Sequence, residues 1–357
     1  MARSKSKNVG LIGLGIIGTR VAATLRKRDF RVYVWNRTPR REQNFLGSPA
    51  EVAEICDVVQ IFVSDGEALL DIVRQLSPGL TATHIVTAHS TISPESMRAA
   101  ADIVQRRGAR FLEAPFTGSK KAAENGQLVY YIGGDEAALQ QARPILEGSS
   151  KEIVAIGEIG DASVIKVATN IVTAATAQVA AEALALVRRA GLSAEIFSRA
   201  MKFNATNSAS LEMKVPKMAA GDFEPHFSVK HMLKDVRIAS HLAQKYSLDL
   251  PVTEAAGDML LEEMKHGRGD ADYSSVAQKY FPAPEREVAP MPAPVVEEKK
   301  AVEPAAEAAK PLPAEPAPPK EEEEEDIPEP VNLSGGFRSW FTQRSHARRK
   351  ARDAGAV

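Results

Sequence analysis

Short apolar runs alternate with helical patterns along the first half of this 357-residue chain. Because helical stretches separate the early runs, the alternation predicts an α/β fold with a doubly wound, mostly parallel sheet and helices on both faces. Ligands of such sheets bind beyond the carboxyl ends of the strands. The predicted strands are Val9–Ile12, Arg31–Trp35, Val58–Val63, His84–Thr87, Arg110–Glu113 and Val129–Ile132.

From about Ala162 the pattern becomes helical throughout. Residues 162–190 contain no proline or glycine and are apolar around most of the helical circumference, which predicts one long helix that stops at Gly191. We therefore expect a Rossmann-type domain at residues 1–161 and an all-α domain at residues 162–281. The long helix has more apolar surface than a small helical domain covers, so we expect a homodimer or homotetramer. The further predicted helices are Ser193–Asn204, Val229–Tyr246 and Val252–His266.

The composition changes again after Phe281. Residues 282–331 are rich in proline, glutamate and alanine and include the acidic block Glu321–Asp326. Such a segment cannot bury enough apolar surface to offset its chain entropy, which predicts a disordered C-terminal tail over residues 282–357. The end of this tail, residues 332–357, combines aromatic residues with arginines. It is interpreted either as a solubilising end or as a basic amphipathic helix for an unidentified partner or an anionic surface.

Charge and cysteine content exclude several classes of function. The net charge of −1 gives no attraction of the whole molecule to nucleic acid or membrane. The single cysteine, Cys56, excludes an internal disulfide framework and suits a reducing compartment, so we expect a cytoplasmic protein. We expect no transmembrane segment, because no run of eighteen apolar residues occurs. The seven histidines have no metal-ligand spacing, and we expect no metal.

A glycine motif follows the first predicted strand. Gly13, Gly15 and Gly18 fit G-x-G-x-x-G, in which glycines allow a tight turn, close approach to a pyrophosphate and close packing of helix on strand. The phosphates sit at the N-terminal end of the following helix. The motif predicts a dinucleotide site, and the alternative is a turn that only packs helix on strand. The predicted loop comprises Gly13, Leu14, Gly15, Ile16, Ile17 and Gly18.

The residues after the second predicted strand indicate which dinucleotide binds. NAD-selective sites usually carry an acidic residue here, which binds the ribose 2′-hydroxyl and would repel a 2′-phosphate. This chain has Asn36, Arg37 and Thr38 instead, followed by Arg40 and Arg41. Since arginine matches phosphate geometry with paired donors, NADPH is expected in preference to NADH. The alternative is a solvated basic loop.

Three further groups are candidates for substrate chemistry. The loop Thr117–Ser119 offers hydroxyls and amides that can bind a carboxylate or the reacting oxygen, although Thr-Gly-Ser is also a common turn. Lys166 lies one turn from Asn170 in an apolar stretch. Burial would lower the pKa of this lysine into the range of general acid–base catalysis, and a surface lysine is the alternative. Lys234 and Asp235 are the third candidate, with a surface ion pair as the alternative.

Six motifs together resemble the β-hydroxyacid dehydrogenase family, and most closely its glyoxylate/succinic semialdehyde reductases. They occur in the order and spacing of the family and cover about residues 8–281, so the tail lies outside the resemblance. The motifs are GLIGLGIIG (10–18), VWNRT (34–38), HSTISPES (89–96), EAPFTGSKKAAENGQL (113–128), GDASVIKVATN (160–170) and FSVKHMLKDVRIA (227–239).

The resemblance implies a role for each matching residue. Lys166 matches the catalytic lysine and Asn170 its partner, while Phe227 would help to close the pocket. Thr91 would lie near the nicotinamide riboside and Lys234 would reach over the nicotinamide. The substrate-binding loop would be Thr117, Gly118 and Ser119. The cofactor-binding residues expected from the motifs, the strand ends and the resemblance are Gly13, Leu14, Gly15, Ile16, Ile17, Gly18, Asn36, Arg37, Thr38, Val63, Ser64, Thr91, Lys234 and Asp235.

The chain departs from the family pattern at several positions. Thr117 stands where serine is usual, which adds a methyl group to the pocket. Ala162 replaces a glycine before the lysine helix. His89 and Phe116 replace smaller residues, and both are expected to add bulk near the pocket. These departures concern the identity of the substrate rather than the class of chemistry.

The resemblance implies NADPH-dependent reduction of a small aldehyde acid, of the glyoxylate or succinic semialdehyde type, to the hydroxy acid. Lys166 would supply the proton. Two alternatives remain. An imine reductase-like enzyme would share the two-domain plan, although such enzymes generally lack a lysine at this position. A non-catalytic NADP-binding interaction module would retain the dehydrogenase fold and bind partners through appended segments.

Overall fold

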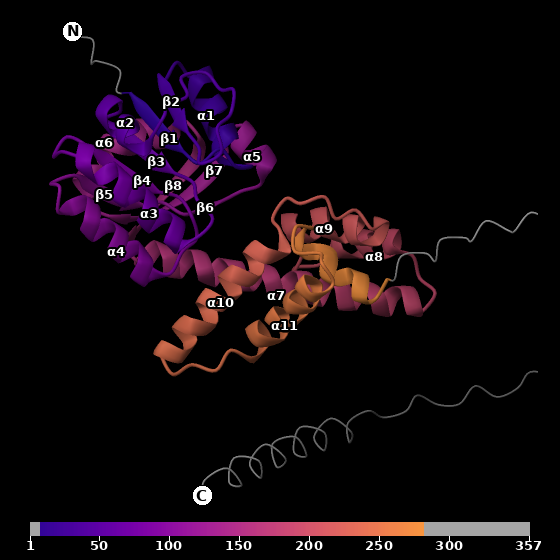
Figure 1. Cartoon of the computed structure of the whole chain (residues 1–357). Coiled ribbons are helices and arrows are strands. Elements are labelled where there is room, and N and C mark those ends of the chain that lie inside the picture. The colour runs from indigo at the N-terminus through magenta and orange to yellow at the C-terminus, as the bar shows by residue number, and fades with distance from the viewer. Residues whose placement is uncertain (1–7, 282–357) are drawn as a thin grey trace, which may run out of the picture. The chain divides into compact units, whose positions relative to one another are not determined.

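The computed structural model describes residues 8–281 (Figure 1). An eight-stranded sheet comes first, and helices follow it. The predictions for the tail over residues 282–357 lie outside the described residues. The strands are β1 (Val9–Ile12), β2 (Val32–Trp35), β3 (Val58–Ile61), β4 (Ile85–Ala88), β5 (Arg110–Glu113), β6 (Phe116–Thr117), β7 (Leu128–Gly134) and β8 (Ser150–Gly157).

The sheet is doubly wound and mostly parallel, as the sequence predicts. Its order is β2-β1-β3-β4-β5-β7-β6, and β8 pairs with β7. Strands β1 to β5 are parallel, whereas β7 runs antiparallel to β5 and β6. Since β2 and β3 lie on opposite sides of β1, the connections diverge there. The carboxyl ends of β1 and β3 therefore form the crevice in which sheets of this kind bind ligands.

Helices cover both faces of the sheet. Strands β1, β3 and β4 are buried along their whole length, which explains their mainly apolar sequences. One apolar core joins the sheet to α1 (Gly18–Lys27), α5 (Lys120–Glu124) and α6 (Glu136–Glu147). A second core joins it to α2 (Pro49–Ile55), α3 (Gly66–Leu76) and α4 (Pro94–Gln105). A short 3-10 helix, η1 (Ser77–Gly79), follows α3.

The second region is helical and is built around α7 (Asp161–Arg189). Gly191 has a positive φ of 77°, and its amide bonds back to the carbonyl of Arg188, so it ends α7 as predicted. The change from sheet to helices falls between β8 and α7, and the division into two domains stays a prediction. The remaining helices are α8 (Ala194–Met201), α9 (Ala209–Ala220), α10 (Val229–Lys245), α11 (Pro251–Lys265) and η2 (Tyr273–Lys279).

The elements that the sequence analysis did not name include β6, β8 and α9. Strand β6 has only two residues, and most side chains of β8 are partly or fully exposed, so neither shows the apolar pattern of a buried strand. Helix α9 contains Pro216, which interrupts the helical signal in the sequence. These elements depend on contacts with neighbours rather than on a local pattern.

The buried carboxylate of Glu113 fastens the start of α7 to the end of β5. Glu113 Oε1 accepts the amide of Ser163 at 3.1 Å, and Oε2 accepts the Ser163 hydroxyl at 3.0 Å. Burial raises the pKa of Glu113, and the hydrogen bonds offset that shift only in part. The contact fixes the first turn of α7, three residues before Lys166.

Helix α7 also presents apolar side chains to the surface. Ile165, Val172, Val179 and Leu186 are exposed and lie seven residues apart, so they form one stripe along the helix. By length and composition α7 is also the one described helix that could cross a membrane. It packs against α9, α10 and α11 and carries buried polar residues such as Asn170 and Gln178, as a core helix does.

Candidate functional site

The glycine loop is held in place by the protein at two of its three glycines. Gly13 has a φ of +98°, and a side chain there would meet the Phe62 carbonyl at 2.0 Å. A side chain at Gly18 would meet the Gly13 carbonyl at 2.0 Å. By contrast, a Cβ at Gly15 would meet nothing within 4 Å. Packing therefore explains Gly13 and Gly18, whereas Gly15 leaves open space where a ligand can approach the backbone.

The loop ends at an uncapped helix. Among the described residues, no side chain caps the N-terminus of α1, so its first amides are available to an anion. Ile16 is exposed and Ile17 is partly buried in this turn. The side chain of Leu14 lies in the core, and its amide donates to Asn36 Oδ1 at 2.9 Å. Leu14 therefore anchors the loop to the core through its side chain and to Asn36 through its amide.

Asn36 joins the glycine loop to the loop after β2. Besides accepting from Leu14, it donates through Nδ2 to the Thr38 carbonyl at 2.8 Å. Arg37 and Thr38 are exposed beside it. The side chain of Asn36 thus forms hydrogen bonds with backbone groups. The exposed side chains of Arg37 and Thr38 are accessible to a ligand.

The ends of β3 and β4 are tied together next to the crevice. The Ser90 hydroxyl accepts the amide of Val63 at 2.9 Å and donates to its carbonyl. Ser64 is exposed and donates to Asp65 at 2.6 Å. Burial raises the pKa of Asp65, but bonds from Ser64 and Ala68 and the charge of nearby Lys234 outweigh burial and lower it overall.

Lys166, Asn170 and Asp235 meet where α7 packs against α10. Asp235 is 1% exposed, and its Oδ2 accepts Asn170 Nδ2 at 2.5 Å. Its Oδ1 accepts Lys234 Nζ at 2.6 Å, and Lys234 also donates to the Thr91 carbonyl. This set joins α7, α10 and the loop after β4. The structure therefore brings together five residues that the sequence predicts for the site.

Lys166 is the buried cation of this group. It is 8% exposed, and no described carboxylate lies within ion-pair distance of its ammonium group. Burial lowers the pKa of Lys166 to about 8; the charge of Asp235 opposes this shift and that of Lys234 adds to it. A lysine with this pKa exchanges a proton near neutral pH, which ordinary surface lysines do not.

The predicted substrate loop lies at the start of α5. Gly118 has a φ of +133°, and a side chain there would meet Leu128 at 2.9 Å, so the turn requires glycine. Thr117 is exposed on β6. The hydroxyl of Ser119 accepts the amide of Ala122 as the N-cap of α5. The loop is thus anchored at Ser119, and Thr117 has the freest side chain.

Phe227 lies just before α10. Its ring packs edge-on against Tyr273, with centroids 6.1 Å apart, and lies parallel to the ring of His231 at 6.3 Å. His231 hydrogen-bonds Ser228 at 2.7 Å. It lies four residues before Asp235 on α10, and so on the same side of the helix. The sequence analysis considered His231 only as a metal ligand and missed it as a neighbour of Phe227. Its four-residue spacing from both Phe227 and Asp235 could have indicated this position.

Two departures from the family pattern pack against the core. His89 is fully buried, stacks on Phe62 at 4.3 Å and bonds the Ala114 carbonyl at 3.0 Å. Burial lowers its pKa to about 3, so it stays neutral. Phe116 is partly buried and packs against Phe62. The His89 ring therefore packs within the core, and the expectation that it adds bulk near the pocket stays a prediction.

Ala162 is fully buried at the start of α7. The helix begins there without strain, since Gly160 rather than Ala162 carries the positive φ of 106°.

Within residues 8–281, no cluster of three or more histidine, cysteine, aspartate or glutamate side chains is placed to hold a metal ion.

Comparison with known proteins relates both regions to dehydrogenases. Residues 8–157 match the model for the NAD binding domain of 6-phosphogluconate dehydrogenase. Residues 160–280 match the model for the NAD-binding domain of NADP-dependent 3-hydroxyisobutyrate dehydrogenase.

Individual relatives extend this result. The chain is 30% identical over 290 residues to glyoxylate/succinic semialdehyde reductase 2, chloroplastic, of Arabidopsis thaliana, with 78% of this chain and 81% of that protein covered. It is also 30% identical to cytokine-like nuclear factor N-PAC of Mus musculus, covering 77% of this chain and 51% of that protein. Among solved structures, a Mycobacterium tuberculosis 3-hydroxyisobutyrate dehydrogenase with L-serine aligns with a TM-score of 0.70 and 26% identity, covering 78% of this chain and 99% of that one.

Asp235→Asn is expected to lower the pKa of Lys166 by about one unit or more, because the carboxylate favours the charged lysine. The pKa can be followed by NMR of ¹³C-methylated lysines, with the signal assigned by Lys166→Arg. Asp249→Asn, in the exposed loop after α10, is the control and leaves the pKa unchanged. An unchanged pKa in Asp235→Asn would show that Asp235 does not act on Lys166.

Proposed function

Since this chain belongs to the β-hydroxyacid dehydrogenase family and is an NAD(P)-dependent oxidoreductase, we propose that it uses NADPH to reduce a small aldehyde acid to the hydroxy acid. The glyoxylate or succinic semialdehyde type of substrate is favoured. The observation that carries this proposal is Lys166, a buried lysine with a pKa of about 8 beside Asn170 and Asp235.

The residues of the glycine loop fit a dinucleotide. The open space at Gly15 and the uncapped start of α1 suit a pyrophosphate, which is negatively charged and needs close approach to the backbone. The exposed guanidinium of Arg37 suits a 2′-phosphate, and no acidic residue follows β2 directly. These features support NADPH over NADH.

Lys166 would act as the proton donor. When bound, the reduced nicotinamide supplies the hydride to the carbonyl carbon. The ammonium group of Lys166 would protonate the oxygen, while Asn170 orients the substrate. The loop of Thr117 and Ser119 would bind the carboxylate through its hydroxyl and amide donors, and Phe227 would keep water from the carbonyl.

A binding module without catalysis is the second candidate. The similarity to N-PAC, whose name is that of a nuclear factor, favours it. Turnover of NADPH with glyoxylate, succinic semialdehyde or tartronate semialdehyde distinguishes the two, because a binding module oxidises no NADPH.

Assembly and location are also proposals. The apolar stripe of Ile165, Val172, Val179 and Leu186 supports a homodimer or homotetramer, because exposed apolar surface of this extent is typical of an interface. The single buried cysteine supports a reducing compartment such as the cytoplasm.

Lys166→Ala is expected to lower the turnover of the aldehyde acid about 10²–10⁴-fold, as the loss of a general acid does. The Kd for NADPH stays nearly unchanged, and Lys151→Ala, which replaces an exposed lysine of β8, serves as the control.

Reduction needs the protonated amine of Lys166, so kcat/KM of the wild type for the aldehyde acid falls as pH rises through about 8. Oxidation of the hydroxy acid needs the neutral amine, so its rate rises through the same pH. Wild-type turnover in Lys166→Ala would contradict this role.

Arg37→Ala is expected to raise the KM for NADPH at least about tenfold and the KM for NADH less than about twofold, because a charge-assisted contact to the 2′-phosphate is lost. The initial rate of absorbance change at 340 nm gives both constants. Arg106→Ala, an exposed arginine after α4, is the matched control. Equal losses for the two cofactors would argue against a 2′-phosphate contact.

Replacing both Val172 and Val179 by glutamate is expected to give a monomer of about 38.5 kDa, because charges in the stripe oppose burial. Light scattering after size exclusion measures the mass. Val154→Glu, on the exposed part of β8, retains the wild-type mass. A wild type that is itself monomeric would refute the proposed assembly.

A further inference from the structure

A second buried lysine lies in the helical region, away from Lys166. Lys214 on α9 and Asp272 form an ion pair at 2.5 Å, with side chains 3% and 2% exposed. The Lys214 ammonium also lies over the ring of Tyr273, 4.5 Å from its centroid. Removing two charges from water is costly, and well-packed apolar residues can stabilise a core equally well. The position of the pair therefore calls for an explanation other than stability.

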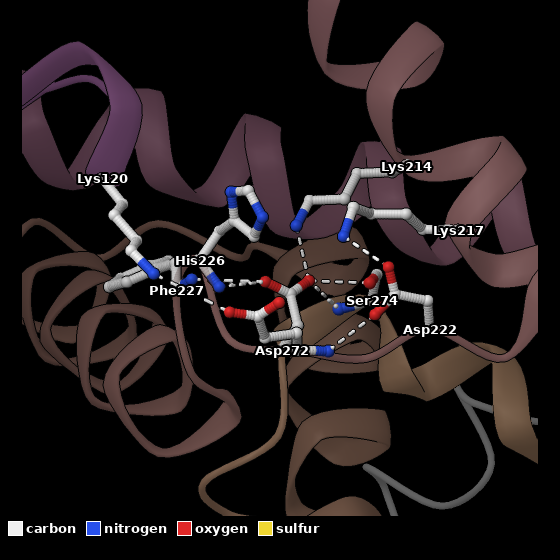
Figure 2. A network of polar contacts seen from close by, with 9 residues as sticks. Lys120, Lys214, Lys217, Asp222, His226, Phe227, Asp272 and Ser274 are labelled. Atoms are coloured by element: carbon white, nitrogen blue, oxygen red, sulfur yellow. Dashed lines mark hydrogen bonds and ion pairs between the residues drawn. The ribbon is translucent and has the colours of Figure 1, made fainter. Parts of the chain in front are cut away.

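Asp272 uses both carboxylate oxygens to hold the chain around it (Figure 2). Oδ1 accepts Lys214 Nζ and also the amide and hydroxyl of Ser274, at 3.1 and 2.7 Å. Oδ2 accepts the amides of His226 and Phe227, at 3.0 and 3.2 Å. Five donors thus converge on one carboxylate, and Lys214 is the one that balances its charge.

The two amides on Oδ2 belong to the segment that leads into α10. On the far side of the same residue, the Phe227 carbonyl accepts the amide of Tyr273 at 2.9 Å, and its ring contacts the Tyr273 ring. Phe227 is therefore fixed through its amide, its carbonyl and its ring. All three contacts come from residues 272–273, which the ion pair holds in place.

The same segment reaches the predicted substrate loop. Glu224 Oε1 lies 3.8 Å from the ammonium nitrogen of Lys120, the first residue of α5, which directly follows Thr117–Ser119. Both side chains are well exposed, so this contact contributes little energy. It does show that the segment before α10 faces the substrate loop. The buried pair of Lys214 and Asp272 is thus the contact that fixes this segment, whereas the exposed pair of Lys120 and Glu224 contributes little.

We propose that the buried ion pair of Lys214 and Asp272 is a positioning device, which fixes the backbone of His226 and Phe227 and so sets the Phe227 ring against the bound acid. This inference rests on the proposed function, in which Phe227 closes the pocket. Neither Lys214 nor Asp272 contacts the substrate. Their effect is on the affinity and selectivity for the acid and leaves cofactor binding intact.

The test compares Lys214→Met with Lys217→Met. Lys217 lies on the same helix in a more exposed pair with Asp222 at 2.6 Å, so it is a matched control. Lys214→Met is expected to raise the KM for the aldehyde acid about tenfold, while the KM for NADPH stays within about twofold. Lys217→Met keeps both constants. Lys214→Arg, which keeps the charge, restores the KM to within about threefold of wild type.

A double-mutant cycle with Phe227→Ala separates positioning from general destabilisation. If the pair acts through Phe227, Lys214→Met adds no further increase in KM once Phe227 is alanine. The inference would be overturned if the increases in KM caused by Lys214→Met and Phe227→Ala multiplied in the double variant. It would also be overturned if Lys214→Met left the KM for the acid as unchanged as Lys217→Met does. Lys214→Gln, which keeps a donor toward Asp272, gives the same comparison if the methionine variant does not fold. Wild-type protein without turnover of any acid would instead overturn the proposed function, and with it this inference.

Discussion

The carboxylate of Asp235 is the contact on which the rest of the candidate site depends. One oxygen accepts Asn170 and the other accepts Lys234, and Lys166 lies near this carboxylate without an ion pair to it. Lys234 extends the contact to the Thr91 carbonyl of the sheet region. The same carboxylate thus joins α7, α10 and the loop after β4. Burial lowers the pKa of Lys166 to about 8, and the nearby charge of Asp235 offsets this shift only in part.

The two buried lysines of the helical region show how the surroundings decide what a lysine does. Burial lowers the pKa of Lys214 as well, but its carboxylate partner at 2.5 Å opposes that shift, and its ammonium also lies over an aromatic ring, so this lysine suits a structural contact. Lys166 is also buried but forms no ion pair with a carboxylate among the described residues. Burial therefore disfavours its charged form and lowers its pKa, so that it can lose its proton. Sequence alone does not separate these cases, because both lysines lie in helices among apolar residues.

The sequence predicted the central strands well because they are mainly apolar runs and because a glycine motif follows the first of them. It also named Lys166 with Asn170, and Lys234 with Asp235, as separate candidates from helical spacing and family resemblance, but it did not predict that Asp235 joins the two pairs. It did not predict that Asn36 holds the Leu14 amide, because that contact spans 22 residues and leaves no local pattern. For the same reason it missed Asp272, whose carboxylate accepts amides 45 and 46 residues earlier in the chain.

Glu113 has a consequence for how the specificity of this scaffold can evolve or be engineered. Its carboxylate grips the amide and hydroxyl of Ser163, so α7 cannot slide by one residue relative to β5 without losing both bonds. The height of the Lys166 amine above the sheet is thereby set independently of the loops around it. In the proposed reaction, the loops at Thr117–Ser119 and before α10 could then be exchanged to admit new acids without moving the proposed proton donor.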